Sequence, residues 1–199
     1  MCQLLETIQL LDGELLNIAY HNRRFNAARK ELSGKLSPTD LAGLIQIPGH
    51  CMTGRFRCRI LYNEADSKVE FIPYEYRKIR RLKLIYDNTI DYHLKYADRS
   101  HLDALFSRRG DCDDIIIVKN GCLTDSYVAN LVFYDGKDWC TPDTPLLKGT
   151  QRASLLDKGV ISEKHITIKN YRSFKEAGLI NAFNDLTNMP VISVQEIYP

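Results

Sequence analysis

The sequence lacks a long hydrophobic run. Its longest unbroken aliphatic stretch, Ile115–Val118, is far shorter than the roughly 20 apolar residues of a membrane-spanning helix. The N-terminus also lacks a basic stretch followed by a long apolar stretch and a small-residue cleavage site. We therefore expect a protein that does not cross a membrane and stays in the cytoplasm.

Paired cysteines are also lacking. None of the six cysteines forms a CxxC pair or has the histidine spacing of a zinc site. A disulfide framework and a structural metal are therefore not indicated, and we expect free thiols and no bound metal. The cysteines are at positions 2, 51, 58, 112, 122 and 140.

The chain has little excess charge of either sign, because its formal net charge is +2. Residues 55–83 are nevertheless basic, and clustered arginines and lysines are typical of nucleic-acid binding. In this segment Phe56, Cys58 and Ile60 alternate with arginines. That alternation indicates a half-buried strand with a cationic face, which could attract an anionic substrate. We expect no nucleic acid as a partner.

With 199 residues, 44% of them hydrophobic and 26% charged, the chain is typical of a globular protein with one domain or two small ones. The first half predicts a mixture of strands and helices. The predicted strands are 4–10, 15–19 (after a turn at Asp12-Gly13), 55–62, 68–74 and 81–87, and the predicted helices are 21–32 and a short one after Asp40.

The second half predicts a helix from about Ser100, followed mainly by short strands. The predicted strands are 115–119, 127–134, 161–168, 179–183 and 191–197, and the further helices are 152–158 and 173–177. Together the two halves indicate the α+β class.

Three features could carry chemistry. Lys95 lies between an aromatic segment and a helix; a lysine that forms a Schiff base must be neutral part of the time, which burial or nearby cations promote. Gly149 precedes a helix, whose unpaired N–H groups can bind an anion. Asp125 enters an apolar strand, where a buried acid needs a partner such as a protonated pyridine nitrogen. A surface lysine, a helix cap and a turn aspartate are the alternative interpretations.

Taken together and in this order, the motifs resemble those of class IV, or fold type IV, pyridoxal phosphate enzymes over nearly the whole chain. His21-Asn22-Arg23-Arg24-Phe25 is similar to the family's His-x-x-Arg-Leu helix, and Lys95 matches its Schiff-base lysine. Asp125, five residues before Asn130-Leu131, matches the glutamate of a Glu-x-x-x-x-Asn-Leu strand.

Further motifs follow in the same order. Gly149-Thr150-Gln151-Arg152 resembles the family's Gly-Ile-Thr-Arg loop, preceded by Thr141-Pro142. The resemblance implies that the cofactor phosphate is bound by Arg24, by Gly149, Thr150 and Gln151, and by a second pair of backbone donors at Asn184-Asp185. It also implies that Asp125 contacts the pyridine nitrogen.

Two departures from the family pattern affect this transfer. Asp125 is one methylene shorter than glutamate, so its contact with the ring nitrogen needs a backbone shift or a bridging water. Gln151 replaces a threonine that binds phosphate, which removes one hydroxyl contact but leaves the backbone donors in place.

Within the family, Lys95-Tyr96-Ala97-Asp98-Arg99 is closer to the Lys-x-x-Asn-Arg of the lyases than to the pattern of branched-chain transaminases. Leu5-Glu6-Thr7 is similar to the lyases' Phe-x-Thr, which makes Thr7 a second catalytic candidate beside Lys95. The resemblance thus implies an aminodeoxychorismate lyase that forms 4-aminobenzoate and pyruvate for folate synthesis. The alternatives are a class IV aminotransferase for branched-chain or D-amino acids, and a catalytically silent member or binding module.

The implied architecture has a small α/β domain at residues 1–90 and a barrel-like pyridoxal phosphate domain at residues 91–199, with the cofactor in the cleft between them. The resemblance also implies a homodimer and a small anionic amino substrate. Substrate carboxylates would find partners among Arg57, Arg59 and Arg99.

Overall fold

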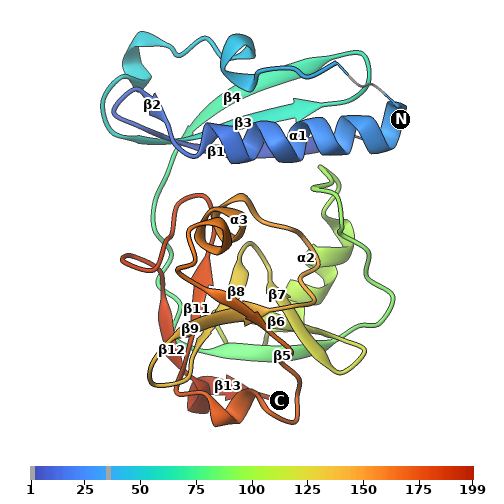
Figure 1. The fold of residues 1–199 in the computed structure, drawn as a ribbon, viewed down its shortest axis with the longest axis vertical. Coiled ribbons are helices and arrows are strands. Elements are labelled where there is room, and N and C mark those ends of the chain that lie inside the picture. Colours follow the sequence, from blue (N-terminus) through green and yellow to red (C-terminus); the bar gives the residue numbers. More distant parts are fainter. Residues whose placement is uncertain (1–2, 35–36) are drawn as a thin grey trace. The chain divides into compact units, whose positions relative to one another are not determined.

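The computed structural model describes residues 3–34 and 37–199, which form two compact units. Unit 1 contains the described residues up to Tyr76 together with Leu94–Asp98, and unit 2 contains Arg77–His93 and Arg99–Pro199 (Figure 1). The boundary expected near residue 90 therefore falls inside unit 2. The sequence pattern also gave no sign that Leu94–Asp98 returns to unit 1.

Unit 1 is built on an antiparallel sheet in the order β2-β1-β3-β4. Its strands are β1 (Leu4–Leu11), β2 (Glu14–Leu15), β3 (Arg55–Tyr62) and β4 (Ser67–Pro73). The turn between β1 and β2 has Asp12 at φ 47° and Gly13 at φ 83°, a left-handed pair that suits a tight hairpin. The sequence predicted β1, β3 and β4 to within a residue or two.

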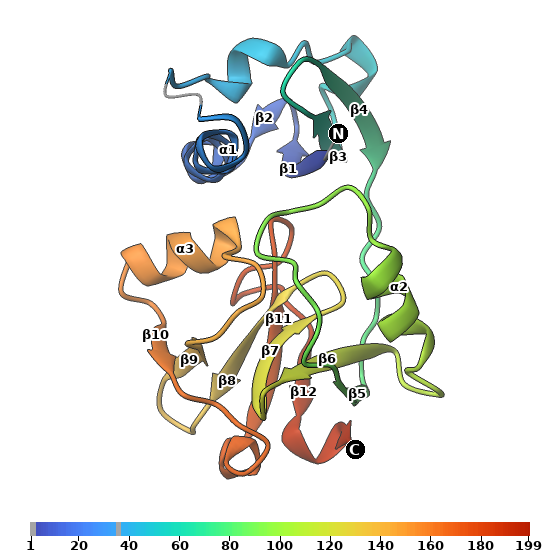
Figure 2. The same cartoon turned by 90° about the vertical axis from the view of Figure 1, so that its right-hand side faces the viewer.

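Helix α1 (Ile18–Ser33) packs on one face of this sheet (Figure 2). The strand expected over residues 15–19 is wrong beyond Leu15, because Asn17 at φ 53° turns the chain directly into the helix. Phe25 and Ala28 of α1 are buried against Ile8 and Ile60 of the sheet. Two short 3₁₀ turns, η1 (Leu41–Leu44) and η2 (Gly49–Cys51), complete the unit.

Unit 2 is a nine-stranded mixed sheet. Strands β5 to β10 and β13 follow the order β10-β9-β8-β7-β6-β5-β13, and β8 also pairs with β11, which pairs with β12. Strand β8 is the branch point of the sheet, because it pairs with β7, β9 and β11. The strands are β5 (Leu82–Tyr86), β6 (Asp114–Lys119), β7 (Cys122–Ser126), β8 (Asn130–Tyr134), β9 (Trp139–Pro142), β10 (Ser162–Lys164), β11 (Glu176–Ile180), β12 (Val191–Ser193) and β13 (Ile197–Tyr198).

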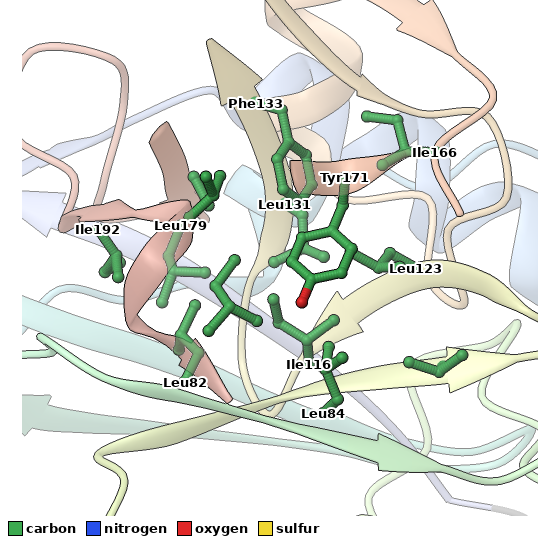
Figure 3. Close-up of a cluster of buried hydrophobic side chains, with 14 of the residues drawn as sticks. Leu82, Leu84, Ile116, Leu123, Leu131, Phe133, Ile166, Tyr171, Leu179 and Ile192 are labelled. Atoms are coloured by element: carbon green, nitrogen blue, oxygen red, sulfur yellow. The ribbon is translucent and has the colours of Figure 1, made fainter. Parts of the chain in front are cut away.

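The core of unit 2 is apolar and almost inaccessible to solvent. Leu131 and Phe133 of β8 lie beside Ile116 of β6 and Leu179 of β11, all at most 1% exposed, and Figure 3 shows these side chains converging on one centre. Burying one such side chain stabilises a fold by about 1.5–3 kcal/mol. The core fixes β7 and β8, whose polar residues belong to the candidate site.

Short helices connect the strands of unit 2: α2 (Ser100–Ser107), α3 (Thr150–Asp157), η3 (Tyr171–Ser173) and η4 (Val194–Glu196). The helix expected at 173–177 is wrong, because Glu176 begins β11 in register with Tyr134. The strand expected at 161–168 is confined to Ser162–Lys164. Within the described ranges, no helix has the length and apolar character needed to cross a membrane.

Candidate active site

Lys95 lies in a short segment that pairs with β1. Its carbonyl oxygen accepts a 2.8 Å hydrogen bond from Leu5 N, and Tyr96 forms a bridge with Leu4. The Lys95 side chain is half-buried. Its positive charge lies close enough to His21 of α1 to help lower the pKa of that histidine.

A buried polar cluster occupies that side of the sheet. The Glu6 carboxylate is completely inaccessible. Its Oε1 accepts from Arg24 Nε at 2.8 Å, and its Oε2 accepts from Arg24 Nη2 and meets His21 Nδ1, both at 2.6 Å. His21 is 0% exposed, and the Arg24 side chain is 16% exposed. The resemblance singled out Arg24, but the sequence pattern gave no role to Glu6.

The cluster holds one carboxylate and one guanidinium in their charged forms. Burial raises the pKa of Glu6, but the Arg24 charge and the hydrogen bonds from His21 and Arg24 outweigh burial and bring that pKa to about 2. Burial lowers the pKa of His21 despite the contact with Glu6, so His21 is neutral at neutral pH. Because an ionised carboxylate only accepts hydrogen bonds, the His21 proton must be on Nδ1.

Thr7 lies on the opposite face of the sheet from Glu6, because successive strand residues point to opposite faces. It is half-buried and pairs in register with Arg59, while Gln9 pairs with Arg57. Arg59 Nη1 is 3.4 Å from Glu70 Oε2. The structure therefore places Thr7 with two arginines, and Arg24 and Lys95 near His21.

In unit 2, Asp125 of β7 is a buried acid held by two hydrogen bonds. Its Oδ1 accepts from Asn130 Nδ2 at 2.8 Å, and its Oδ2 accepts from Leu147 N at 2.9 Å. Burial raises the pKa of Asp125 to about 6, although both hydrogen bonds oppose that rise. Asn130 Nδ2 also donates to Leu147 O at 2.8 Å, so Asp125 and Asn130 together fix the loop that precedes α3.

Gly149 caps the N-terminus of α3 without a side-chain hydrogen bond. A Cβ atom at this position would collide with Asn130 Oδ1, so the close approach requires glycine. The first helical hydrogen bond runs from Ala153 N to Gly149 O at 2.9 Å, and Thr150 and Gln151 are buried behind it. The positive end of a helix that begins at such a turn favours an anion.

Asn184 and Asp185 are arranged differently from the expected pair of backbone donors. Asn184 N donates to Asn181 O at 3.2 Å, and Asp185 N donates to Asn188 Oδ1 at 2.8 Å, so the turn uses both N–H groups internally. The Asp185 carboxylate accepts from Thr187 N and Oγ1. The group of this turn that can bind a ligand is the side-chain amide of Asn184, which is buried and whose Oδ1 has no hydrogen-bond partner.

Arg152 is the arginine of the glycine-loop motif, and its guanidinium is buried in unit 2. Nε donates to Thr141 Oγ1 at 3.3 Å, and Nη2 donates to Pro142 O at 3.0 Å and to Glu163 Oε1 at 2.5 Å. These contacts tie α3 to β9 and β10. The Thr-Pro and Gly-x-x-Arg motifs are therefore parts of one structural connection.

The residues of unit 2 fit a cofactor with a phosphate and a basic ring nitrogen. The N-terminus of α3 suits the phosphate, and the orphaned Asn184 amide can turn its Nδ2 towards an anion, since amide orientation follows the hydrogen-bond network. A buried carboxylate such as Asp125 can pair with a protonated ring nitrogen. Among residues 3–34 and 37–199, no group of three or more metal-ligating side chains could hold an ion.

Comparison with known proteins places the chain in a family. Residues 92–197 match the model of amino-transferase class IV, so the chain belongs to that family. An uncharacterized protein from Haemophilus influenzae is 40% identical over 188 residues, which cover 94% of this chain and all of that protein.

Solved structures agree with this assignment. A candidate 4-amino-4-deoxychorismate lyase from Haemophilus somnus 129pt is 38% identical and superposes with a TM-score of 0.88, covering 94% of this chain and 98% of its own. A hypothetical aminotransferase from Mycobacterium tuberculosis in its PLP-bound form shares the fold, with a TM-score of 0.76 at 15% identity over 96% of this chain and 80% of that one. The expected two-part α+β fold of this family is confirmed.

Proposed function

We propose that the protein is a pyridoxal 5′-phosphate enzyme that cleaves 4-amino-4-deoxychorismate to 4-aminobenzoate and pyruvate. The observation that carries the cofactor proposal is the buried Asp125–Asn130 pair, which holds the loop before Gly149. It joins an acid suited to a ring nitrogen to a helix N-terminus suited to a phosphate. The likeness to the candidate lyase from Haemophilus somnus supports the choice of reaction.

Different residues would bind the phosphate and the ring nitrogen of the cofactor. Arg24, the turn Gly149-Thr150-Gln151 and the Asn184-Asp185 turn would hold the phosphate, with the Asn184 amide as the donor in the last case. Asp125 would accept a hydrogen bond from the protonated ring nitrogen. With a pKa of about 6, Asp125 is mostly ionised at neutral pH, as this pairing requires.

Lys95 would carry the cofactor and move the proton in the reaction. When bound, pyridoxal phosphate supplies an electron sink for the charge left after a proton leaves the carbon that bears the substrate amine. Lys95 would remove that proton and release the product amine, and Thr7 would assist on the substrate side. Loss of the enolpyruvyl group then leaves an aromatic ring, and the released enolpyruvate becomes pyruvate.

The substrate carboxylates require cations. Thr7 and Gln9 share a sheet face with Arg59 and Arg57, so this face supplies a positive charge beside a hydroxyl and an amide. We propose that it receives a small anionic amino substrate, that the enzyme is a cytoplasmic homodimer, and that it serves folate synthesis.

An aminotransferase acting on branched-chain or D-amino acids is the second candidate, favoured by the fold shared with the aminotransferase from Mycobacterium tuberculosis. The two reactions differ in one requirement, because a transaminase needs a 2-oxo acid to complete its cycle and a lyase needs none.

The test is to incubate the purified protein, loaded with pyridoxal phosphate, with 4-amino-4-deoxychorismate and to follow 4-aminobenzoate by its fluorescence. We expect product without any oxo acid, and no product with Lys95→Ala. If turnover appears only with an amino acid and a 2-oxo acid, the protein is a transaminase. If neither reaction occurs while the cofactor binds, the chain is a catalytically silent member of the family.

A further inference from the structure

We propose that Glu6 is a positioning residue that orients the Arg24 guanidinium for a phosphate dianion. The inference rests on the proposed function, because it concerns the cofactor phosphate. Its basis is a contact inside unit 1: both carboxylate oxygens of the inaccessible Glu6 accept from Arg24, at 2.6 and 2.8 Å.

The two-point contact fixes the plane of the guanidinium. Arginine has five N–H groups in a planar fork, and a contact through Nε and one terminal nitrogen defines where the remaining N–H groups point. The Arg24 side chain is 16% exposed, so part of it reaches the surface of unit 1 while Glu6 stays covered. A guanidinium that is already oriented loses less side-chain entropy when it binds an anion.

His21 also holds the Glu6 carboxylate in place. Its Nδ1–H donates to Glu6 Oε2 at 2.6 Å, so the carboxylate that holds Arg24 is itself held. Because His21 and Arg24 are three residues apart in α1, both point from the same helical face towards β1. Glu6 therefore links the strand next to Lys95 with the helix that carries the proposed phosphate arginine.

The cluster also explains why position 6 has a carboxylate rather than an amide. Glutamine could accept from one N–H of Arg24, but in either orientation its amide nitrogen would face the other N–H of Arg24, and in one orientation also the Nδ1–H of His21. One donor would then be opposed by another donor in a site without solvent. Glu6→Gln should therefore release the guanidinium while keeping the shape of the side chain.

The experiment compares two ligands that differ only in the phosphate. Pyridoxal has the aldehyde and ring nitrogen of pyridoxal phosphate but no phosphate group. Dissociation constants of both are measured by absorbance titration for the wild type and for Glu6→Gln. We expect the Kd of pyridoxal phosphate to rise about tenfold or more and the Kd of pyridoxal to change less than about twofold, so that the preference for the phosphorylated form falls.

Asp40→Asn is the matched control. Asp40 also accepts from a side chain of α1, Asn22 Nδ2 at 2.8 Å, but it lies on the surface. Removing this carboxylate should leave both dissociation constants unchanged. Circular dichroism of each variant before titration establishes that it is folded.

A second pair of variants covers the case in which Glu6→Gln does not fold. Glu6→Asp keeps the charge and should retain part of the preference for the phosphorylated ligand. Arg24→Lys keeps the charge at position 24 but removes the fork, so it should lose the preference, and adding Glu6→Asp to it should change the preference no further.

The outcomes separate the claims. Equal weakening of both ligands in Glu6→Gln, or additive losses of preference in the double variant, would overturn the positioning role and leave the proposed function intact. Failure of the wild type to bind pyridoxal phosphate would overturn the proposed function and the inference with it.

Discussion

Replacing Gly149 with alanine tests the link between the loop before α3 and the buried acid. The new Cβ would collide with Asn130 Oδ1, so the Asn130 side chain must move. It then loses its hydrogen bonds to Asp125 Oδ1 and Leu147 O, both 2.8 Å long. A hydrogen bond to a charged group contributes about 1.5–3 kcal/mol and one to a neutral group about 0.5–1.5 kcal/mol. We therefore expect a loss of about 2–4 kcal/mol.

The assay is urea unfolding followed by tryptophan fluorescence. The chain has a single tryptophan, Trp139 in β9, so the signal reports on unit 2. Gly49→Ala serves as control, because no atom lies within 4 Å of the added Cβ and the backbone there is ordinary. The control should change the fluorescence transition little.

A double-mutant cycle with Asn130→Ala makes the prediction specific. Without the Asn130 amide the collision disappears, so Gly149→Ala should then cost only the roughly 1 kcal/mol typical of a poorer N-cap residue. Equal costs of Gly149→Ala in both backgrounds would refute the reasoning, since the damage would then come from the helix cap rather than from the Asp125–Asn130 pair.

Three further predictions follow from buried charges. The pKa of Glu6 is lowered from 4.5 to about 2, so about 3 kcal/mol of stability is present above pH 4.5 and is lost as the pH falls towards 2. The melting temperature of Glu6→Gln should lack this dependence on acid pH. Parallel plots of melting temperature against pH for the variant and the wild type would contradict the prediction. The pKa of Asp125 is raised from 3.8 to about 6, so this group has the opposite effect: about 3 kcal/mol of stability is lost as the pH rises from about 4 through 6. In urea unfolding followed by Trp139 fluorescence, the stability of Asp125→Asn should decline less than that of the wild type over this range. An equal decline in both proteins would exclude Asp125 as the cause. Arg152→Lys removes the forked contact with Thr141 and Pro142 and should destabilise unit 2 by about 2 kcal/mol in urea, whereas an unchanged midpoint would show that the contact contributes nothing.

The sequence predicted the elements with strong periodicity and missed those without it. In β3, apolar residues alternate with arginines, and in α1 they recur at helical spacing, so both were found. Strand β7, Cys122–Ser126, has no such alternation and forms because it lies between β6 and β8. The register with β8 likewise makes Glu176 and Ala177 part of strand β11, where local composition indicated a helix.

The candidate site was predictable through family motifs and less so through residue chemistry. Glu6 looks like one polar residue in an apolar strand, and its role depends on α1 bringing His21 and Arg24 to the same face of the sheet. A charged residue on the buried face between Leu4 and Ile8 was the available signal. The internal hydrogen bonds of the Asn184-Asp185 turn depend on Asn181 and Asn188 and could not be read from those two residues alone.

The most direct test of the central claim is the absorbance spectrum of the purified protein with pyridoxal phosphate, before and after borohydride reduction. We predict a band near the visible edge, which reduction converts into a stable adduct on the peptide that contains Lys95, and no such adduct in Lys95→Ala. A wild-type protein without the band, or a band that persists unchanged in Lys95→Ala, would contradict the claim that this lysine binds the cofactor.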